Sequence, residues 1–119
     1  MRIAIDLDGT ILTFNWSDWM LSGMNYFGNP KRDAKKVIEM LYNDGHEIII
    51  HTCRTNPVLI EGYSQKELKT RVAKTLADHG IKYHSIWDGQ GKPIADIYID
   101  DNGYKFENWI KVVDDLNLD

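Results

Sequence analysis

The sequence predicts an α/β fold in which a mostly parallel sheet carries helices on both faces. Short apolar runs that end in polar residues alternate along the chain with longer stretches of helical periodicity. A helix between two strands is the usual connection of a parallel pair, because such strands need a crossover of a dozen or more residues. The 119 residues suffice for one core, so residues 1–119 are expected to form a single domain.

The first apolar run, residues 2–6, ends in a pair of acids. Asp6 closes the run, Asp8 follows two residues later, and Gly9 comes next. Because ligands bind at the carboxyl ends of strands in open α/β sheets, these acids are candidates for a site. Two carboxylates this close repel each other unless a cation or a shared proton compensates, and Mg²⁺ prefers such oxygen ligands. This stretch alone leaves a second interpretation open, a capped turn with two solvated acids.

Residues 11–29, which we call the aromatic flap, are rich in aromatic and methionine side chains and show no clean period. One interpretation is that they cover an edge of the sheet. The other is a short flap over the acidic site that shapes an apolar, partly aromatic pocket. The two interpretations are compatible with each other.

Three segments predict helices. The first, residues 30–44, has Asn29 as N-cap and Pro30 at the first helical position. The second begins with a capping box at residues 64–67 and ends at Gly80. The third is a last amphipathic helix with an apolar stripe of Phe106, Trp109, Ile110, Val113 and Leu116.

Three further apolar runs predict strands at residues 47–52, 81–87 and 95–101. The first of these leads into Thr52 and Arg54, and the last ends in Asp100 and Asp101. The loop before the last strand carries Lys92. Strand ends of one sense lie on the same edge of a parallel sheet, so these side chains are expected to converge with the acids of the first strand.

This set of acids, a hydroxyl and cations suits phosphoryl transfer. A metal ion and a lysine neutralise the phosphate charge, which otherwise repels an anionic nucleophile. One carboxylate can attack phosphorus to form an aspartyl-phosphate, and a second can protonate the leaving oxygen and then activate water. Arg54 has two interpretations: it binds the substrate phosphate, or it pairs with an acid. Asp101 either contributes to the metal site or begins a turn.

Four motifs resemble those of the haloacid dehalogenase-like (HAD) hydrolase superfamily, in the same order. They are Asp6-Leu7-Asp8-Gly9-Thr10, Thr52 after an isoleucine run, Lys92-Pro93, and Asp100-Asp101. The resemblance spans most of the chain and implies a Rossmann-like sheet with the first strand central. Because an acid stands at the position of Asp8, the chain resembles the phosphatase branch of the superfamily and not the dehalogenases.

The resemblance also implies a role for each motif residue. Asp6 would be the nucleophile and Asp8 the general acid and base. The cofactor would be Mg²⁺, bound by the side chain of Asp6, the backbone carbonyl of Asp8, and Asp100. Thr52 and Lys92 would hold the transferring phosphoryl group.

The chain departs from the family pattern in two ways. Lys92 lies only eight positions before Asp100, closer than in many members, and neither usual insertion point holds a cap domain. The chain therefore resembles the small, capless members of the superfamily, some of which are linked to bacterial capsular polysaccharide synthesis. An open site implies either a large substrate or closure by the partner in a homo-oligomer.

Composition narrows the class of partner. A net charge of −4 without a long basic run argues against nonspecific binding to nucleic acid or to an anionic membrane. No apolar run is long enough to span a membrane, and the N-terminus lacks a signal-peptide pattern. Cys53 is the single cysteine, so no intrachain disulfide can form and a reducing, cytoplasmic location is expected.

Together these observations predict a Mg²⁺-dependent phosphohydrolase that acts on a small-molecule phosphomonoester, either a sugar phosphate or a nucleotide. The alternative is a non-catalytic or slow phosphate- and metal-binding module of the receiver type. In receiver domains the lysine follows the fifth strand, whereas Lys92 precedes the second acid pair here. A third hypothesis, a scaffold with partner contacts through Trp16, Trp19 and Tyr26, is disfavoured because every apparent catalytic position is filled.

Overall fold

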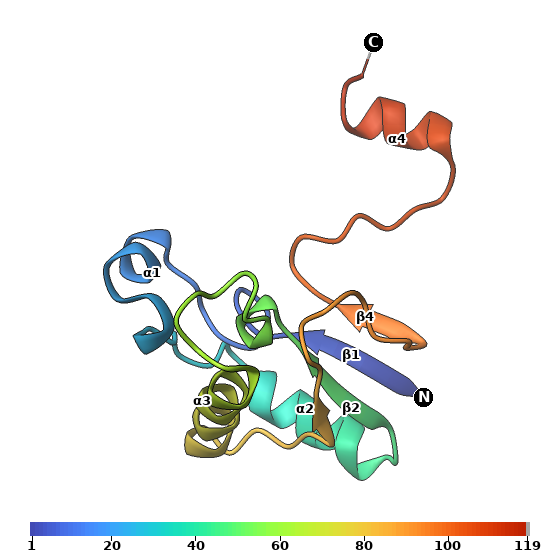
Figure 1. Ribbon diagram of the computed structural model, residues 1–119. Coiled ribbons are helices and arrows are strands. Elements are labelled where there is room, and N and C mark those ends of the chain that lie inside the picture. Colours follow the sequence, from blue (N-terminus) through green and yellow to red (C-terminus); the bar gives the residue numbers. More distant parts are fainter. Residues whose placement is uncertain (119) are drawn as a thin grey trace.

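The computed structural model describes residues 1–118 and contains a four-stranded sheet flanked by helices (Figure 1). The strands are β1 (Arg2–Asp6), β2 (Glu47–His51), β3 (Ser85–Ile86) and β4 (Ile97–Ile99). All pairs are parallel, and the order is β3-β2-β1-β4. The predicted α/β class is confirmed, and the arrangement is Rossmann-like with the first strand inside the sheet.

The two inner strands, β1 and β2, carry the core. Ile3 pairs with Ile48 and Ile5 with Ile50, and all four side chains are buried. Strands of a parallel sheet that are covered on both faces read as continuous apolar runs, which is the pattern of these two segments. Because the register brings Asp6 level with the end of β2, both strands deliver their next residues to the same edge.

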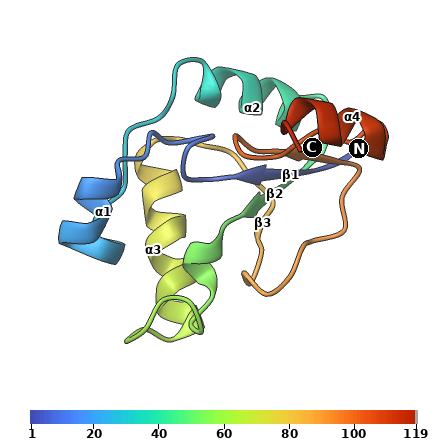
Figure 2. The same ribbon diagram turned by 90° about the horizontal axis from the view of Figure 1, so that it is seen from above.

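Helices cover both faces of the sheet. In Figure 2, α2 (Ala34–Asn43) lies on one side of the strands and α3 (Gln65–Asp78) on the other. The inward stripe of α3 consists of Leu68, Val72 and Leu76, all fully buried. The predicted capping box is present: the Ser64 hydroxyl accepts from Glu67 N at 3.2 Å, and the Glu67 carboxylate accepts from Ser64 N at 3.4 Å.

The helix predicted over residues 30–44 begins later than expected. Pro30 instead forms an isolated antiparallel bridge with Leu12, and Lys31 N donates to Ile11 O at 2.8 Å. These contacts hold residues 30 and 31 in extended backbone against the aromatic flap. Helix α2 starts only after Asp33, whose φ of +64° is left-handed. The prediction of an N-cap at Asn29 and a proline at the first helical position was therefore wrong.

The outer strands are shorter than predicted. β3 covers Ser85–Ile86 within the expected 81–87, and β4 covers Ile97–Ile99 within 95–101. Both lie at an edge of the sheet and pair on one side only. Edge strands gain half the ladder hydrogen bonds of inner strands, so pairing ends sooner where the flanking sequence is polar or rich in glycine.

The last helix, α4 (Trp109–Asp115), stands away from the sheet at the end of an extended connector (Figure 1). The helix begins at Trp109, so Phe106 of the predicted apolar stripe lies before it, and Trp109 and Ile110 are 73% and 74% exposed. The face of β4 that such a helix would cover remains partly open, with Ile97 and Ile99 each 39% exposed. Within residues 1–118, no helix combines the length and apolar character that crossing a membrane requires.

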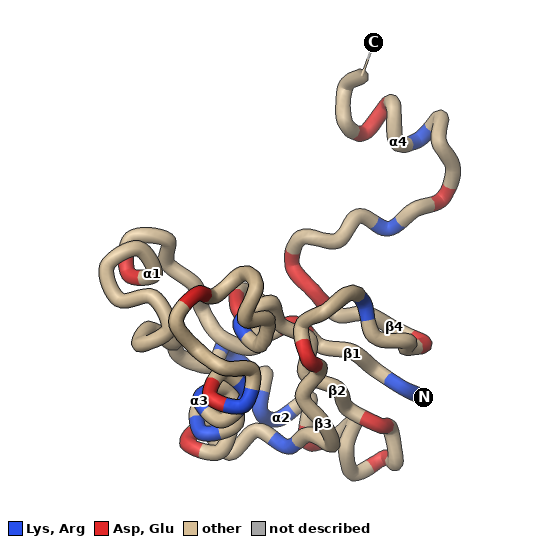
Figure 3. The backbone as a smooth tube through the Cα atoms, viewed as in Figure 1, with Lys and Arg blue, Asp and Glu red and all other residues tan. Residues whose placement is uncertain are grey.

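Acidic and basic residues are interspersed along the tube in Figure 3, and no long basic stretch appears. This distribution matches the acidic net charge of −4. A surface that attracts polyanions over a large area would show clustered lysines and arginines instead.

Candidate active site

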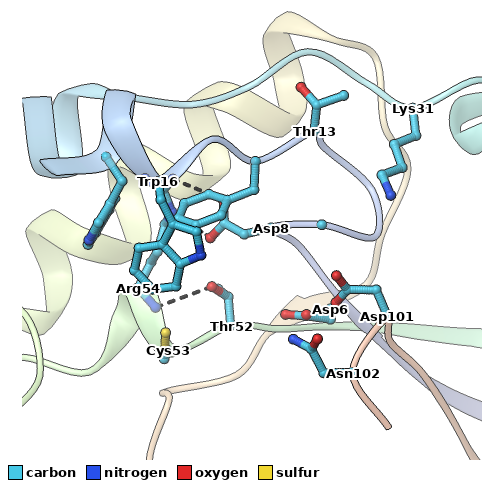
Figure 4. A pocket seen from close by; sticks show the side chains of 13 residues that line it. Asp6, Asp8, Thr13, Trp16, Lys31, Thr52, Cys53, Arg54, Asp101 and Asn102 are labelled. Atoms are coloured by element: carbon cyan, nitrogen blue, oxygen red, sulfur yellow. Dashed lines mark hydrogen bonds and ion pairs between the residues drawn. The ribbon is translucent and has the colours of Figure 1, made fainter. Parts of the chain in front are cut away.

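A cavity of about 620 Å³ opens where β1 and β2 end, between the acidic turn and the aromatic flap (Figure 4). Residues from five segments of the chain line it: the turn after β1, the flap, the residue after Pro30, the end of β2 and the connector after β4. Its lining residues are Asp6, Asp8, Gly9, Thr13, Phe14, Trp16, Trp19, Lys31, Thr52, Cys53, Arg54, Asp101 and Asn102. Most of the predicted site residues therefore converge.

Asp6 lies at the floor of this cavity. Its carboxylate accepts a hydrogen bond from Leu7 N at 2.9 Å. Its pKa is raised to about 6, chiefly by burial and further by the charges of Asp8, Asp101 and Asp100, whereas the hydrogen bond from Leu7 lowers it. The acids around Asp6 therefore repel its negative charge, and a bound cation would reduce this repulsion.

The acidic turn folds tightly around Leu7. The amides of Ile11 and Leu12 both donate to Leu7 O at 3.0 Å, and Gly9 N donates to Leu12 O at 2.8 Å. Gly9 has a φ of +83°, and a Cβ atom there would clash with the carboxylate of Asp101. A glycine is required at this position because the turn is left-handed and the end of β4 approaches it closely.

Thr52 and Cys53 follow β2 at the same edge. Thr52 is buried, and its hydroxyl oxygen accepts from Arg54 N at 3.2 Å while lining the cavity. Burial raises the pKa of the Cys53 thiol, and the carboxylates of Asp8 and Asp6 raise it further. A thiol in this environment stays protonated at neutral pH, so Cys53 is not an activated nucleophile.

Arg54 is buried, and groups of the chain itself occupy its guanidinium. The side chain is 1% exposed. It donates to both carboxylate oxygens of Asp8, at 2.7 and 2.9 Å, and to the backbone carbonyl of Tyr26 at 2.6 Å. Of the two interpretations of Arg54, pairing with an acid is the one found, and binding of a substrate phosphate by Arg54 stays a prediction.

The two acids after β4 line different cavities, both of which Asp6 also borders. Asp101 lines the large cavity next to Asn102. Asp100 lines a neighbouring cavity of about 400 Å³ that Asp6 and Thr52 also border. The Asp100 carboxylate accepts from the backbone amides of Asn102, at 2.9 Å, and of Gly103, so it also closes the turn that follows β4.

Lys92 is the one predicted site residue that lines neither of these cavities. Its ammonium lies over the ring of Tyr98 instead. It remains close to the end of β2, where burial lowers the pKa of His51 and the Lys92 charge lowers it further. The predicted convergence of Lys92 with the other motif residues is therefore incomplete in this structure.

Lys31 is a cavity residue that the sequence analysis missed. Lys31 lies just after the flap, and its side chain points toward Asp6 and Asp101 (Figure 4). The one sequence signal next to it is Pro30, which the sequence analysis interpreted as the start of the helix. Its placement depends on the bridge between Pro30 and Leu12, a contact that helical spacing does not indicate.

The aromatic flap forms the outer wall of the cavity and contains α1 (Trp16–Ser22) and the short helix η1 (Gly23–Asn25). The Phe14 ring contacts Trp16 edge-on with centroids 5.1 Å apart, and its centroid is 6.2 Å from that of Trp19. The Trp16 side chain is 71% exposed although it borders the cavity. Of the two interpretations of residues 11–29, a wall over the acidic site describes this part of the flap.

Comparisons with known proteins bear on the fold. No family model matches the chain, and no curated protein matches it. A solved structure of a conserved protein from Bacteroides thetaiotaomicron is similar over 98% of this chain and 89% of the other, with a TM-score of 0.62. The two sequences are 22% identical, so the similarity shows a shared fold and carries no statement about activity.

Proposed function

We propose that this protein is a Mg²⁺-dependent phosphohydrolase that releases phosphate from a phosphomonoester through an aspartyl-phosphate on Asp6. The observation that carries the proposal is the meeting of Asp6, Asp8 and Thr52 around one cavity. Thr52 comes from a different strand, so its position beside the acids does not follow from sequence proximity. The resemblance of the four motifs to HAD hydrolases favours the same function.

In the proposed reaction, a carboxylate oxygen of Asp6 attacks phosphorus and the bond from phosphorus to the ester oxygen breaks. The departing oxygen takes a proton from solvent, because both carboxylate oxygens of Asp8 accept hydrogen bonds from Arg54. A water molecule then attacks phosphorus, Asp8 takes the proton of this water as general base, and the bond from phosphorus to Asp6 breaks. Asp8 then returns this proton to solvent. Inorganic phosphate and an alcohol are the products, and both aspartates return to their starting states.

The donors present fit a magnesium ion. Within residues 1–118 no group of three His, Cys, Asp or Glu side chains is placed to hold a metal ion. Mg²⁺, however, is commonly held by one or two carboxylates with waters and a carbonyl. Asp6, the backbone carbonyl of Asp8, and Asp100 or Asp101 would supply these ligands. When bound, the ion would neutralise charge on the phosphoryl group.

The substrate class we propose is a small phosphomonoester with a ring next to the phosphate. The cavity combines an acidic floor with the rings of Phe14, Trp16 and Trp19. Aromatic side chains stack on the faces of sugar rings and of nucleobases. A sugar phosphate and a nucleotide both satisfy this arrangement.

The test is release of inorganic phosphate from a panel of sugar phosphates and nucleotides, with and without Mg²⁺. We expect turnover in the presence of Mg²⁺, and we expect D6N to abolish it. Asp78, paired with Lys74 on the surface of α3, provides the matched control D78N, which should hydrolyse like the wild type. Absence of phosphate release from every ester would refute the proposal. A stable phosphorylated Asp6 without turnover would favour the receiver-type alternative.

A further inference from the structure

Arg54 lies in the short helix η2 (Cys53–Thr55). Its side chain forms an ion pair with the carboxylate of Asp8. Nε donates to one oxygen of Asp8 at 2.7 Å, and a terminal nitrogen donates to the other oxygen at 2.9 Å. Two parallel hydrogen bonds fix the plane of a carboxylate as well as its position, which a single contact does not. Arg54 therefore sets the orientation of Asp8 in the cavity.

The remaining contacts of the guanidinium come from the aromatic flap. Its other terminal nitrogen donates to Tyr26 O at 2.6 Å and lies 3.8 Å from the sulfur of Met24. The ring centres of Trp19 and Phe27 lie 4.7 and 4.2 Å from its central carbon. These are hydrogen-bonding and cation–π contacts that exist only while the flap is in place.

Burial makes these two sets of contacts depend on each other. The flap and the end of β2 bury the Arg54 side chain, and arginine keeps its charge under all ordinary conditions. A buried cation is costly unless a paired anion compensates, and Asp8 is the anion found here. Replacement of the Asp8 carboxylate by a neutral amide would leave the Arg54 cation unpaired and would favour opening of the flap. Opening of the flap would in turn remove the contacts that fix the guanidinium against Asp8.

We propose that Arg54 is a positioning residue that couples closure of the aromatic flap to the orientation of Asp8. A closed flap holds the guanidinium, and the guanidinium holds the carboxylate in place to take a proton from the attacking water. An open flap releases both. The catalytic consequence rests on the proposed phosphohydrolase function, whereas the coupling between Asp8 and the flap does not. Coupling of this kind is reciprocal, so a change at Asp8 must alter the flap, and a change in the flap must alter the orientation of Asp8.

The kinetic test replaces Arg54 by Lys, which keeps the positive charge and removes the bidentate pair of hydrogen bonds to Asp8. The matched control is R71K, because Arg71 donates to Asn25 in the flap at 2.9 Å and stacks on Tyr63 without contacting Asp8. We expect R54K to lower kcat about tenfold with KM within about twofold, and R71K to leave both within about twofold. An equal loss of kcat in the two variants would overturn the positioning role.

The second test needs no enzymatic activity and follows amide hydrogen exchange in residues 14–27. We expect D8N, which alters no flap residue, to speed exchange there about fivefold, and R54K to do the same. The double variant should exchange no faster than the faster single variant. Unchanged exchange in β2 would show that each variant is folded. Slow flap exchange in D8N would overturn the coupling even if the protein hydrolyses phosphate esters, and fast exchange would support it even if it hydrolyses none.

Discussion

The ammonium of Lys92 lies 3.9 Å from the centre of the Tyr98 ring, whereas Lys31 lines the cavity that contains Asp6. The motif that carries Lys92 resembles the one whose lysine holds the phosphoryl group in HAD hydrolases. In this structure a different lysine, Lys31, lines the cavity, and we propose that it contacts the phosphate there. The two assignments lead to opposite results when each lysine is removed.

We expect K31M to raise KM for a phosphomonoester about tenfold, because it removes a charge-assisted contact from the cavity. K92M should change KM less than about twofold. K36M serves as the control, since Lys36 is exposed on α2 and does not line the cavity. Steady-state phosphate release measures all three. A large effect of K92M with none of K31M would assign the phosphoryl contact to Lys92.

The raised pKa of Asp6, about 6, predicts how stability depends on pH. The folded protein binds this proton more tightly than the unfolded chain, where the pKa is 3.8. Ionising Asp6 therefore costs folding free energy, a cost that grows between pH 4 and 6 and is fully present above pH 6. Allowing for solvent screening of this partly exposed group, D6N should be more stable than the wild type by about 1–2 kcal/mol at pH 7.

Urea unfolding in metal-free buffer measures this difference, and it should vanish below about pH 4 because both carboxyls are then neutral. D78N is again the control, because Asp78 lies in an exposed ion pair on α3. A stability difference between D6N and the wild type that is the same at pH 4 and pH 7 would contradict the assigned cause.

Magnesium should stabilise the wild type through Asp6. We expect the Tm to rise with added Mg²⁺ and to fall back with EDTA, because a ligand that binds only the folded state stabilises it. D6N should show no rise. D101N should reduce the rise more than D100N, since the Asp100 carboxylate is already engaged by the amides of Asn102 and Gly103. Differential scanning fluorimetry across a Mg²⁺ titration distinguishes these cases.

Gly9 should not tolerate a side chain. Its φ of +83° strains any other residue, and a Cβ atom would clash with the Asp101 carboxylate. We expect G9A to lose about 1–3 kcal/mol of stability and to turn the Asp101 side chain away from the acidic turn. G45A is the comparison, because Gly45 has a similar φ of +89° with nothing within 4 Å of its Cβ position. A larger loss in G9A than in G45A isolates the clash from the backbone strain.

Local sequence patterns predicted the inner part of the fold. The continuous apolar runs of β1 and β2 have one stable environment, a strand covered on both faces, and the structure places them there. The capping box at Ser64 and Glu67 marked the start of α3, because both of its hydrogen bonds form between neighbours in the sequence. The start of α2 was missed because Pro30 pairs with Leu12, a contact between residues far apart in the chain.

The sequence by itself determined which strands form the centre of the sheet and that Asp6, Asp8 and Thr52 follow them at one edge. These features depend on periodicity and strand direction, which are properties of short segments. Only the tertiary structure decided that Arg54 pairs with Asp8, that Lys31 lines the cavity while Lys92 lies over Tyr98, and that α4 stands away from the sheet. Each of these outcomes depends on which distant groups share a buried space, because the energy of a charged side chain is set by the partner it finds there.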